Sequence, residues 1–265
     1  MGSVSFCLSK SDRERNTGLY AMNEQLLLEN IRSVLVRLEE TIIFALIERA
    51  QFHVNEVVYR AGFLAAETGA DSLLGFMLHE TERVHARMRR YTSPDEEPFY
   101  PDLPEPVLPR LSFAENPLHA NDINVNNRIR DMYVHELVPM LCPDGDDSQY
   151  GSTVVCDVAC LQALSKRIHY GKFVAESKFR DDEMLFRELC TEADRDGIVG
   201  AITNEAVEDC VLARVERKAG GHIREITSTG AADVFAAKVV RAFREWIIPM
   251  TKDVEVEYLL GRMEE

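Results

Sequence analysis

The sequence predicts an all-α fold, a single-domain bundle built from long helices. Apolar residues recur at steps of three or four along nearly the whole chain, which is the spacing of one helix face. Sustained alternation of apolar and polar residues, typical of a half-buried strand, does not occur. The chain has 265 residues, of which 46% are hydrophobic, so it is long enough to bury a core without disulfides or metal ions.

The first part of the chain predicts two long helices and then an extended connection. Residues 24–50 carry an unbroken apolar stripe from Leu27 to Ala45, which corresponds to about seven turns of helix. The same spacing returns in residues 72–91. Six of the ten prolines lie between positions 94 and 109. Because prolines this dense prevent helix and strand, residues 92–120 are expected to form an extended surface connection.

The rest of the chain predicts further helices, some with recognisable ends. Asn204 or Thr203 is expected to cap the helix that follows it, and Gly220 with Gly221 to end that helix. The last helix is expected to bend or pause at Pro249. The helices are expected at about residues 123–140, 152–180, 182–192, 204–218 and 231–263.

Residues 1–24 are expected to be a poorly defined N-terminal extension of a domain that spans residues 25–265. No apolar run approaches the ~18 residues that span a bilayer, and the first residues lack the apolar core of a signal peptide. The six cysteines include no C-x-x-C pair, which is typical of reduced thiols. A cytoplasmic location is therefore expected, with a plastid form trimmed of a transit peptide as the alternative.

Charge and motifs exclude several classes of function. The 30 Lys and Arg against 45 Asp and Glu give a net charge of −15, which argues against nucleic acid or an anionic membrane as a partner. The sequence has no G-x-G-x-x-G, P-loop, H-E-x-x-H or nucleophile elbow. A di-iron bundle needs two Glu-x-x-His pairs, and only Glu82 to His85 fits. Neither a metal, a cofactor nor a covalent intermediate is expected.

The polar residues that remain have a spacing that brings some of them together. Arg167 and Lys178 are eleven residues apart, so both project from nearly one helix face, about 16 Å apart along its axis. Two long cationic side chains at that separation could lean toward each other over a small anion.

Other polar residues form pairs on single helix faces. Asn204 and Glu208, like Thr251 and Glu255, are separated by four residues, and Arg32 flanks the first apolar stripe. For each residue alone, a solvated helix face is the stronger interpretation. Spacing by itself gives only a weak indication of a site for a small dianion.

Five blocks of sequence are far more specific than the spacing. They are LQALSKRIHYGKFVAESKF from Leu161, the C-terminal IIPMTKDVEVEYLL, NIRSVLVRLEETIIFALIERAQF at 30–52, RRYTSPDEEPFYP at 89–101 and TNEAVED at 203–209. Taken in their order along the chain, the blocks closely resemble the chorismate mutases of fungi and plants. The resemblance extends from about residue 25 to residue 265 and is weak only around 219–232.

The resemblance implies an all-helical homodimer that converts chorismate to prephenate, on the route to phenylalanine and tyrosine, without a cofactor. The alternative is a non-catalytic helical dimer that senses chorismate or an amino acid. The active-site positions of the family fall on matching residue types here: Arg32, Arg167, Lys178, Asn204, Glu208, Thr251 and Glu255.

The reaction is a pericyclic rearrangement, so nothing has to attack the substrate. The enzyme must fold a flexible dianion into a compact conformer and stabilise charge on the ether oxygen. Arg32 and Arg167 are expected to bind the two carboxylates, because a guanidinium is permanently charged and can bind bidentately. Lys178 and Glu255 are expected to flank the ether oxygen.

The remaining three residues complete the expected site. Glu208, with Asn204, is expected to hold the ring hydroxyl, and Thr251 to orient Lys178 or a substrate carboxylate. Glu255 must be protonated to donate to the ether oxygen, yet an unperturbed Glu is neutral only about 0.2% of the time at pH 7. Activity is therefore expected to fall as the pH rises.

The resemblance also implies an effector site for aromatic amino acids at the dimer interface. Its positions fall on Arg89, Arg90, Gly151 and Ser152. A solvated helix end is the alternative interpretation of the two arginines. Val155 stands where a tyrosine- and tryptophan-responsive fungal enzyme has threonine, and the choice among tryptophan, tyrosine and phenylalanine stays open.

Overall fold

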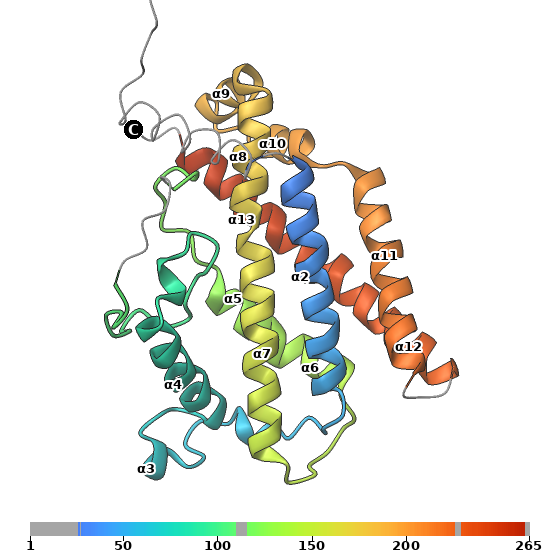
Figure 1. Cartoon of the computed structure of the whole chain (residues 1–265). Coiled ribbons are helices and arrows are strands. Elements are labelled where there is room, and N and C mark those ends of the chain that lie inside the picture. The colour runs from blue at the N-terminus through green and yellow to red at the C-terminus, as the bar shows by residue number, and fades with distance from the viewer. Residues whose placement is uncertain (1–25, 27, 110–115, 226–228, 263–265) are drawn as a thin grey trace, which may run out of the picture.

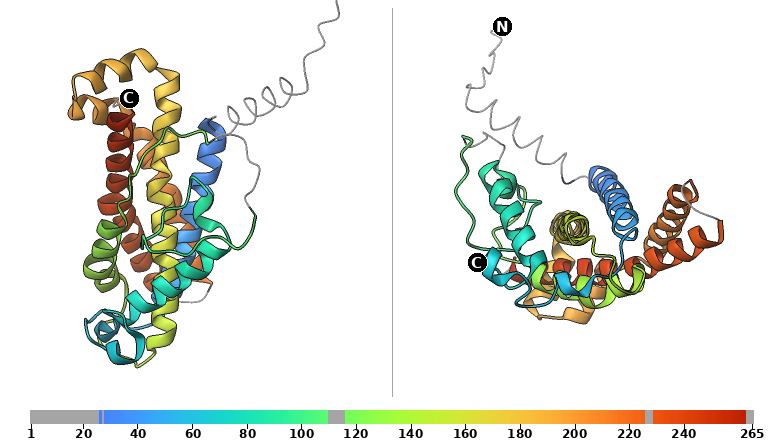
Figure 2. Two further views of the ribbon diagram at one scale, coloured as in Figure 1. Left: turned by 90° about the vertical axis from the view of Figure 1, so that its left-hand side faces the viewer. Right: turned by 90° about the horizontal axis from the view of Figure 1, so that it is seen from below.

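The computed structural model describes residues 26, 28–109, 116–225 and 229–262, and the expected extension 1–24 lies outside them. Within these ranges there is no strand, so the all-α prediction is confirmed. The helices form two layers that cross each other (Figures 1 and 2). One layer holds α4 (Leu73–Arg87), α7 (Tyr150–His169), α8 (Gly171–Asp181), α2 (Leu28–Arg49) and α11 (Glu205–Arg224).

The second layer lies behind the first and contains the C-terminal helices. It holds α5 (Asn126–Met132), α6 (Val138–Leu141), α12 (Thr229–Ala242) and α13 (Ile248–Gly261). The short helices α9 (Glu183–Thr191) and α10 (Arg195–Ile202) sit together at one end of the molecule, and α3 (Ala65–Thr68) lies at the other (Figure 1). Because α13 packs against both α7 and α8, side chains of the two layers face each other there.

The predicted helices are present, with three differences in detail. The helix expected at 152–180 consists of α7 and α8, joined at Tyr170. The sequence prediction missed α10, in which Gly197 and Gly200 weaken the helical pattern. The prediction that Gly220 and Gly221 end a helix is wrong, since α11 continues to Arg224. Ala219, Gly220 and Ile223 are buried along the contact with α12, and this packing outweighs the ~1 kcal/mol that a helical glycine costs.

Two prolines in the second layer widen the helices that contain them. Pro249 follows a π-helical turn at Phe243–Ile247, and Pro139 follows another at Tyr133–Leu137. A proline inside a helix has no N–H to donate and clashes with the carbonyl four residues earlier. The wider turn absorbs that clash, which confirms the irregularity expected at Pro249.

A buried polar cluster joins the end of α2 to α7. Arg49 and Asp157 are both fully buried, and Arg49 Nε donates to Asp157 Oδ1 at 2.6 Å. The hydroxyls of Tyr133 and Tyr59 also donate to this carboxylate, at 2.7 and 2.9 Å. The other guanidinium nitrogens of Arg49 donate to the carbonyls of residues 52–54. With these partners in place the pair holds α2 at a fixed distance from α7.

The proline-rich connection has neither α-helix nor strand in its described parts, 92–109 and 116–120, as predicted. It is nevertheless anchored rather than free. The buried carboxylate of Glu82 on α4 accepts hydrogen bonds from the backbone N–H groups of Phe99 and Tyr100 and from the Tyr91 hydroxyl. The acidic run of the connection forms ion pairs with α7 and α8: Asp95 and Glu96 with Lys166, and Glu97 with Lys172.

None of the described helices is both long enough and apolar enough to cross a membrane.

Candidate active site

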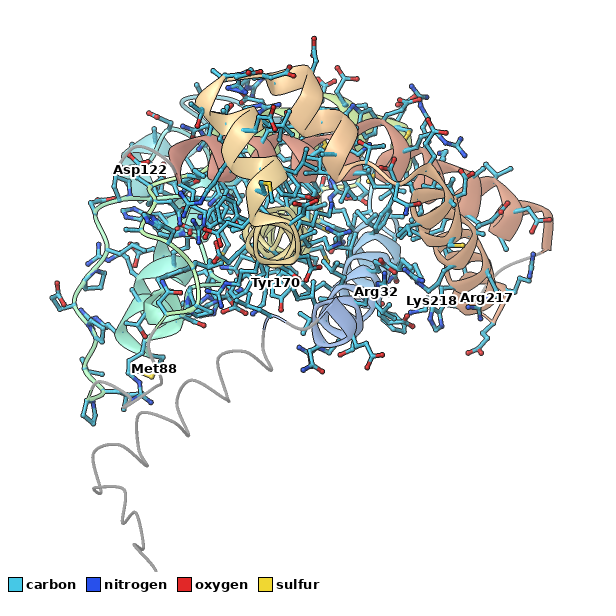
Figure 3. All side chains as sticks on the ribbon, turned by 90° about the horizontal axis from the view of Figure 1, so that it is seen from above. Arg32, Met88, Asp122, Tyr170, Arg217 and Lys218 are labelled. Carbon is cyan, nitrogen blue, oxygen red and sulfur yellow. The ribbon has the colours of Figure 1, made fainter. Side chains whose placement is uncertain are left out.

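One cavity gathers all seven of the site residues that the sequence predicted. It has a volume of about 510 Å³ and opens between α2, α7, α8, α11 and α13. Figure 3 looks onto the end of the molecule at which α2 begins and labels Arg32 on that helix. The cavity is lined by Arg32, Arg167, Lys178, Asn204, Glu208, Thr251 and Glu255, together with apolar residues that include Ile31, Leu35, Val174 and Ile248.

Arg167 is the most buried cation of this cavity. It lies near the end of α7 with 5% of its surface exposed, and Nη1 donates to the Thr251 hydroxyl at 3.3 Å. Its Nε has no hydrogen-bond partner among the described residues. Burial lowers the pKa of Arg167 from its ordinary value, and Glu39 and Glu255 counteract that effect. A buried guanidinium with an unpaired donor has the capacity to bind an anion that enters the cavity.

Thr251 has a different neighbour from the one expected. Its hydroxyl donates to the carbonyl of Ile247, one turn earlier in α13, at 2.7 Å. This bond fixes the oxygen as an acceptor for Arg167. In the absence of substrate, Thr251 therefore orients Arg167 and not Lys178.

Lys178 and Glu255 meet across the contact between α8 and α13. Lys178 Nζ donates to Glu255 Oε2 at 3.0 Å and to the carbonyl of Ile202, at the end of α10, at 2.6 Å. Glu255 is 6% exposed. Burial raises its pKa above the ordinary value, while Lys178, Arg167 and Lys252 oppose the rise. This carboxyl group is therefore easier to protonate than an exposed one.

Gly171 allows α8 and α13 to come this close. A Cβ at Gly171 would lie 2.8 Å from the carbonyl oxygen of Thr251 and 3.4 Å from Cγ of Glu255. A distance under 3 Å to a backbone atom cannot be relieved by rotating a side chain. The absence of a side chain at Gly171 therefore lets two site residues reach the cavity.

Asn204 and Glu208 lie at the start of α11. Asn204 is the N-cap, as predicted, because its Oδ1 accepts from the N–H of Val207 at 3.1 Å. The capping bond leaves the amide nitrogen of Asn204 as a donor at the cavity. Glu208, one turn further along, pairs with Lys252 Nζ at 2.6 Å.

Arg32 is exposed at the mouth of the cavity, on the first turns of α2. Further along the same helix, Glu39 is 1% exposed and accepts two hydrogen bonds from Arg214 of α11, at 2.8 and 3.0 Å. This bidentate pair joins α2 to α11, the two helices that carry Arg32 and Glu208.

Sequence reasoning missed three charged residues of the cavity, namely Asp181, Asp182 and Lys252. Lys252 lies next to Thr251 on α13. It follows Ile248 by four residues and precedes Glu255 by three, so it lies on the helix face that presents these cavity residues. That spacing was visible in the sequence, but Lys252 directly follows Thr251 and resembles an ordinary surface lysine.

The charges in the cavity suit a small anion. Four cations and four carboxylates line it among the described residues, and two of the cations, Lys178 and Lys252, are paired with carboxylates of the lining. The guanidinium of Arg167 keeps an unpaired donor. No group of three or more His, Cys, Asp and Glu in the described ranges is arranged to hold a metal ion. Glu82 and His85, the one Glu-x-x-His pair, have other partners. Glu82 accepts from backbone amides of the connection, and the His85 ring forms a hydrogen bond with Arg90. What the cavity offers is charge, hydrogen-bond donors and a confined shape.

The four residues expected to bind an effector do not meet within one chain. Gly151 and Ser152 line a shallow hollow at the start of α7. Arg90 donates to Gln162 at 2.8 Å, and Gln162 lies ten residues, or about 15 Å, further along α7 than Ser152. Arg89 donates to the carbonyl of Pro109. A ligand that touches both pairs would therefore have to lie between two copies of the chain.

An all-helical protein with a buried, partly unpaired arginine and further cations around a small cavity has the kind of site that binds a compact anion. The sequence pattern of the family described as chorismate mutase type II matches residues 149–256. A chorismate mutase of Schizosaccharomyces pombe is 48% identical over 248 residues, which cover 91% of this chain and 98% of that protein. The chain belongs to the chorismate mutase family and is an isomerase.

Solved structures agree with this assignment. The chorismate mutase of Candida albicans, in complex with L-Trp, has a TM-score of 0.86 and 40% identity, over 92% of this chain and 94% of that one. AtCM1 with tyrosine bound in an allosteric site has a TM-score of 0.84 and 43% identity, over 91% and 98%. A second structure of AtCM1 holds phenylalanine in the allosteric site. The resemblance seen in the five sequence blocks is confirmed.

Proposed function

We propose that the cavity between α2, α7, α8, α11 and α13 is where chorismate rearranges to prephenate. Arg167 carries the proposal. It is a buried guanidinium with an unpaired donor, and three further cations line the same space. A carboxylate of a dianion the size of chorismate would satisfy the unpaired donor of Arg167.

Two arginines would hold the substrate. Arg167 binds one carboxylate from the interior, and Arg32 binds the other from the mouth of the cavity. Fixing both ends of a flexible molecule in one geometry removes much of the entropic barrier to a unimolecular reaction. The unpaired Nε of Arg167 supports this role.

Lys178 and Glu255 would act on the breaking C–O bond. The ether oxygen gains negative charge as the bond breaks, and both side chains can donate to it when Glu255 is protonated. A preorganised donor in a dry site contributes about 3–4 kcal/mol, and even a modest enzyme lowers its barrier by about 8 kcal/mol. Two such donors plus conformational restriction reach that value.

Glu208 and Asn204 would orient the ring. The Glu208 carboxylate accepts a hydrogen bond from the ring hydroxyl, and the Asn204 amide donates to it from the cap of α11. Thr251 acts through Arg167, which it contacts. These roles are the ones that the family resemblance implies, and the charge and donor capacity of each residue support them.

We also propose a homodimer that binds aromatic amino acids between its subunits. Arg89 and Arg90 of one copy would act with Gly151 and Ser152 of the other, because these pairs lie too far apart in one chain to share a small ligand. The tryptophan, tyrosine and phenylalanine in the solved relatives support this kind of ligand. A cytoplasmic location completes the proposal, and a fluorescent fusion of the full-length gene product imaged in its native cells tests it.

Purified protein incubated with chorismate tests the catalytic proposal. We expect chorismate absorbance to fall and prephenate to accumulate without any added cofactor. A protein that binds chorismate, as measured by calorimetry, but leaves its absorbance unchanged would instead be the non-catalytic sensor.

A further inference from the structure

Lys252 lies in the cavity but has no role in the scheme above. It is the residue after Thr251 on α13, and its ammonium group lies 2.6 Å from Glu208 Oε1 on α11. The two side chains are 24% and 29% exposed, so the pair is largely shielded from water. Both residues line the cavity, and their ion pair crosses it from one layer of helices to the other.

Two other ion pairs of α13 are different from this one and from the Lys178–Glu255 pair. Asp253 pairs with Arg128, and Glu257 with Arg195, and in each pair both side chains are about half exposed. Pairs of that kind contribute little, because water screens them. The Lys252–Glu208 pair is more buried and lies beside the space for the substrate. Water screens its two charges less, so each acts more strongly on a molecule that enters the cavity.

We infer that Lys252 is a positioning residue that holds the Glu208 carboxylate in place and compensates its charge. The inference rests on the proposed function, in which Glu208 accepts the ring hydroxyl of chorismate. The substrate brings two negative charges into the cavity, and an uncompensated carboxylate next to it would repel it. With Lys252 in place, Glu208 remains a strong hydrogen-bond acceptor at little electrostatic cost.

Substitution of Lys252 should therefore weaken substrate binding more than chemistry. The ring hydroxyl keeps its bond to carbon through the rearrangement, so its contact with Glu208 is about equal in the ground state and the transition state. Loss of such a uniform interaction raises KM and leaves kcat nearly unchanged. For Lys252→Met we expect KM for chorismate to rise about tenfold or more, with kcat within about threefold of the wild type.

Two further variants make the result specific. Lys252→Arg keeps the positive charge and should return KM to within about threefold of the wild type. Lys218→Met is the matched control, because Lys218 on α11 also pairs with a glutamate, Glu40, and the two side chains are 19% and 30% exposed. Lys218 is not among the residues that line the cavity, so its variant should have wild-type KM and kcat.

A double-mutant cycle tests the partner of Lys252. In a Glu208→Gln background no carboxylate remains to be compensated, so adding Lys252→Met should raise KM by less than about threefold. A full tenfold rise in that background would mean that Lys252 acts on something other than Glu208 and would overturn the inference.

The pH profile gives a readout that a purely structural role would not change. Lys252 is one of the cations that oppose the raised pKa of Glu255. Its removal should move the fall in activity to higher pH, because protonated Glu255 then persists longer. The charged groups that act on Glu255 are Lys178 from α8, Arg167 from α7 and Lys252 from α13. The other charged groups that line the cavity are Arg32 of α2, Glu208 of α11, Asp181 of α8 and Asp182 between α8 and α9.

The two proposals fail in distinguishable ways. If the wild-type protein does not convert chorismate, the proposed function is wrong. If the wild type is active and Lys252→Met has an unchanged KM, only the role of Lys252 is wrong. Circular dichroism checks that each variant is folded. If Lys252→Met does not fold, the KM of Lys252→Gln, which lacks the charge, is compared with the KM of Lys252→Arg, which keeps it.

Discussion

Glu255 is held between two opposing influences on its protonation. It lies on the buried face of α13, where burial raises its pKa, and within 3.0 Å of the Lys178 ammonium group, which lowers it. The net direction is upward. Since the proposed mechanism needs the protonated acid, the active fraction is largest below the raised pKa and falls as the pH rises through it.

Replacement of Glu255 by Gln should change the shape of the pH profile. A Gln amide donates a hydrogen bond at every pH, so the fall in kcat/KM toward alkaline pH should flatten. The measurement is kcat/KM for chorismate between about pH 5 and pH 9. A variant that keeps the steep wild-type fall would assign the titration to another group.

At the residue scale, the sequence predicted which side chains share the cavity but not all of their contacts. Helical spacing gave only a weak indication that Arg167 and Lys178 share a site, and the five matching blocks singled out all seven residues. The partner of Thr251 and the presence of Lys252 were missed. Both depend on how α13 is rotated against α7 and α11, and spacing within one helix does not contain that information.

At the scale of the helices, the close approach of α8 and α13 sets the position of the site. Gly171 contacts the backbone of Thr251, so a side chain there must push the two helices apart. Overpacking of this kind costs about 1–3 kcal/mol. It would also displace Thr251 and Glu255, which belong to the site.

Gly171→Ala should therefore reduce both stability and activity. We expect the free energy of unfolding to fall by about 1–3 kcal/mol in urea titrations and kcat/KM to fall by more than about tenfold. Gly221→Ala is the matched control, since a Cβ at Gly221 meets no atom within 4 Å and alanine favours the helix. Equal behaviour of the two variants would contradict the account of the helix contact.

Two of the differences between predicted and observed helices have a common physical cause. The helix α10 and the end of α11 both contain glycines, which the sequence pattern treats as breaks. In the structure, buried Ile198 and Ile202 hold α10, and α12 holds the end of α11. Packing between elements distant in sequence outweighs local propensity here, whereas the long apolar stripes of α2, α4 and α7 needed no such help.

For the whole molecule, the separation of Arg90 from Ser152 implies that regulation requires two copies. The unliganded protein should sediment with about twice the chain mass of 30.1 kDa. Addition of tryptophan, tyrosine or phenylalanine should shift the chorismate concentration at half-maximal rate by about 5-fold or more for at least one of the three. Unchanged rate curves with all three would remove the effector site from the proposal.

The central claim is that buried positive charge holds the chorismate dianion in its reactive shape. Arg167 is the most deeply buried of the cations that line the cavity. The most direct test is kcat/KM for the loss of chorismate absorbance by Arg167→Ala, compared with the wild type. We predict a fall of at least about 100-fold, with the far-ultraviolet circular dichroism spectrum unchanged. A folded Arg167→Ala protein with wild-type kcat/KM would contradict the claim.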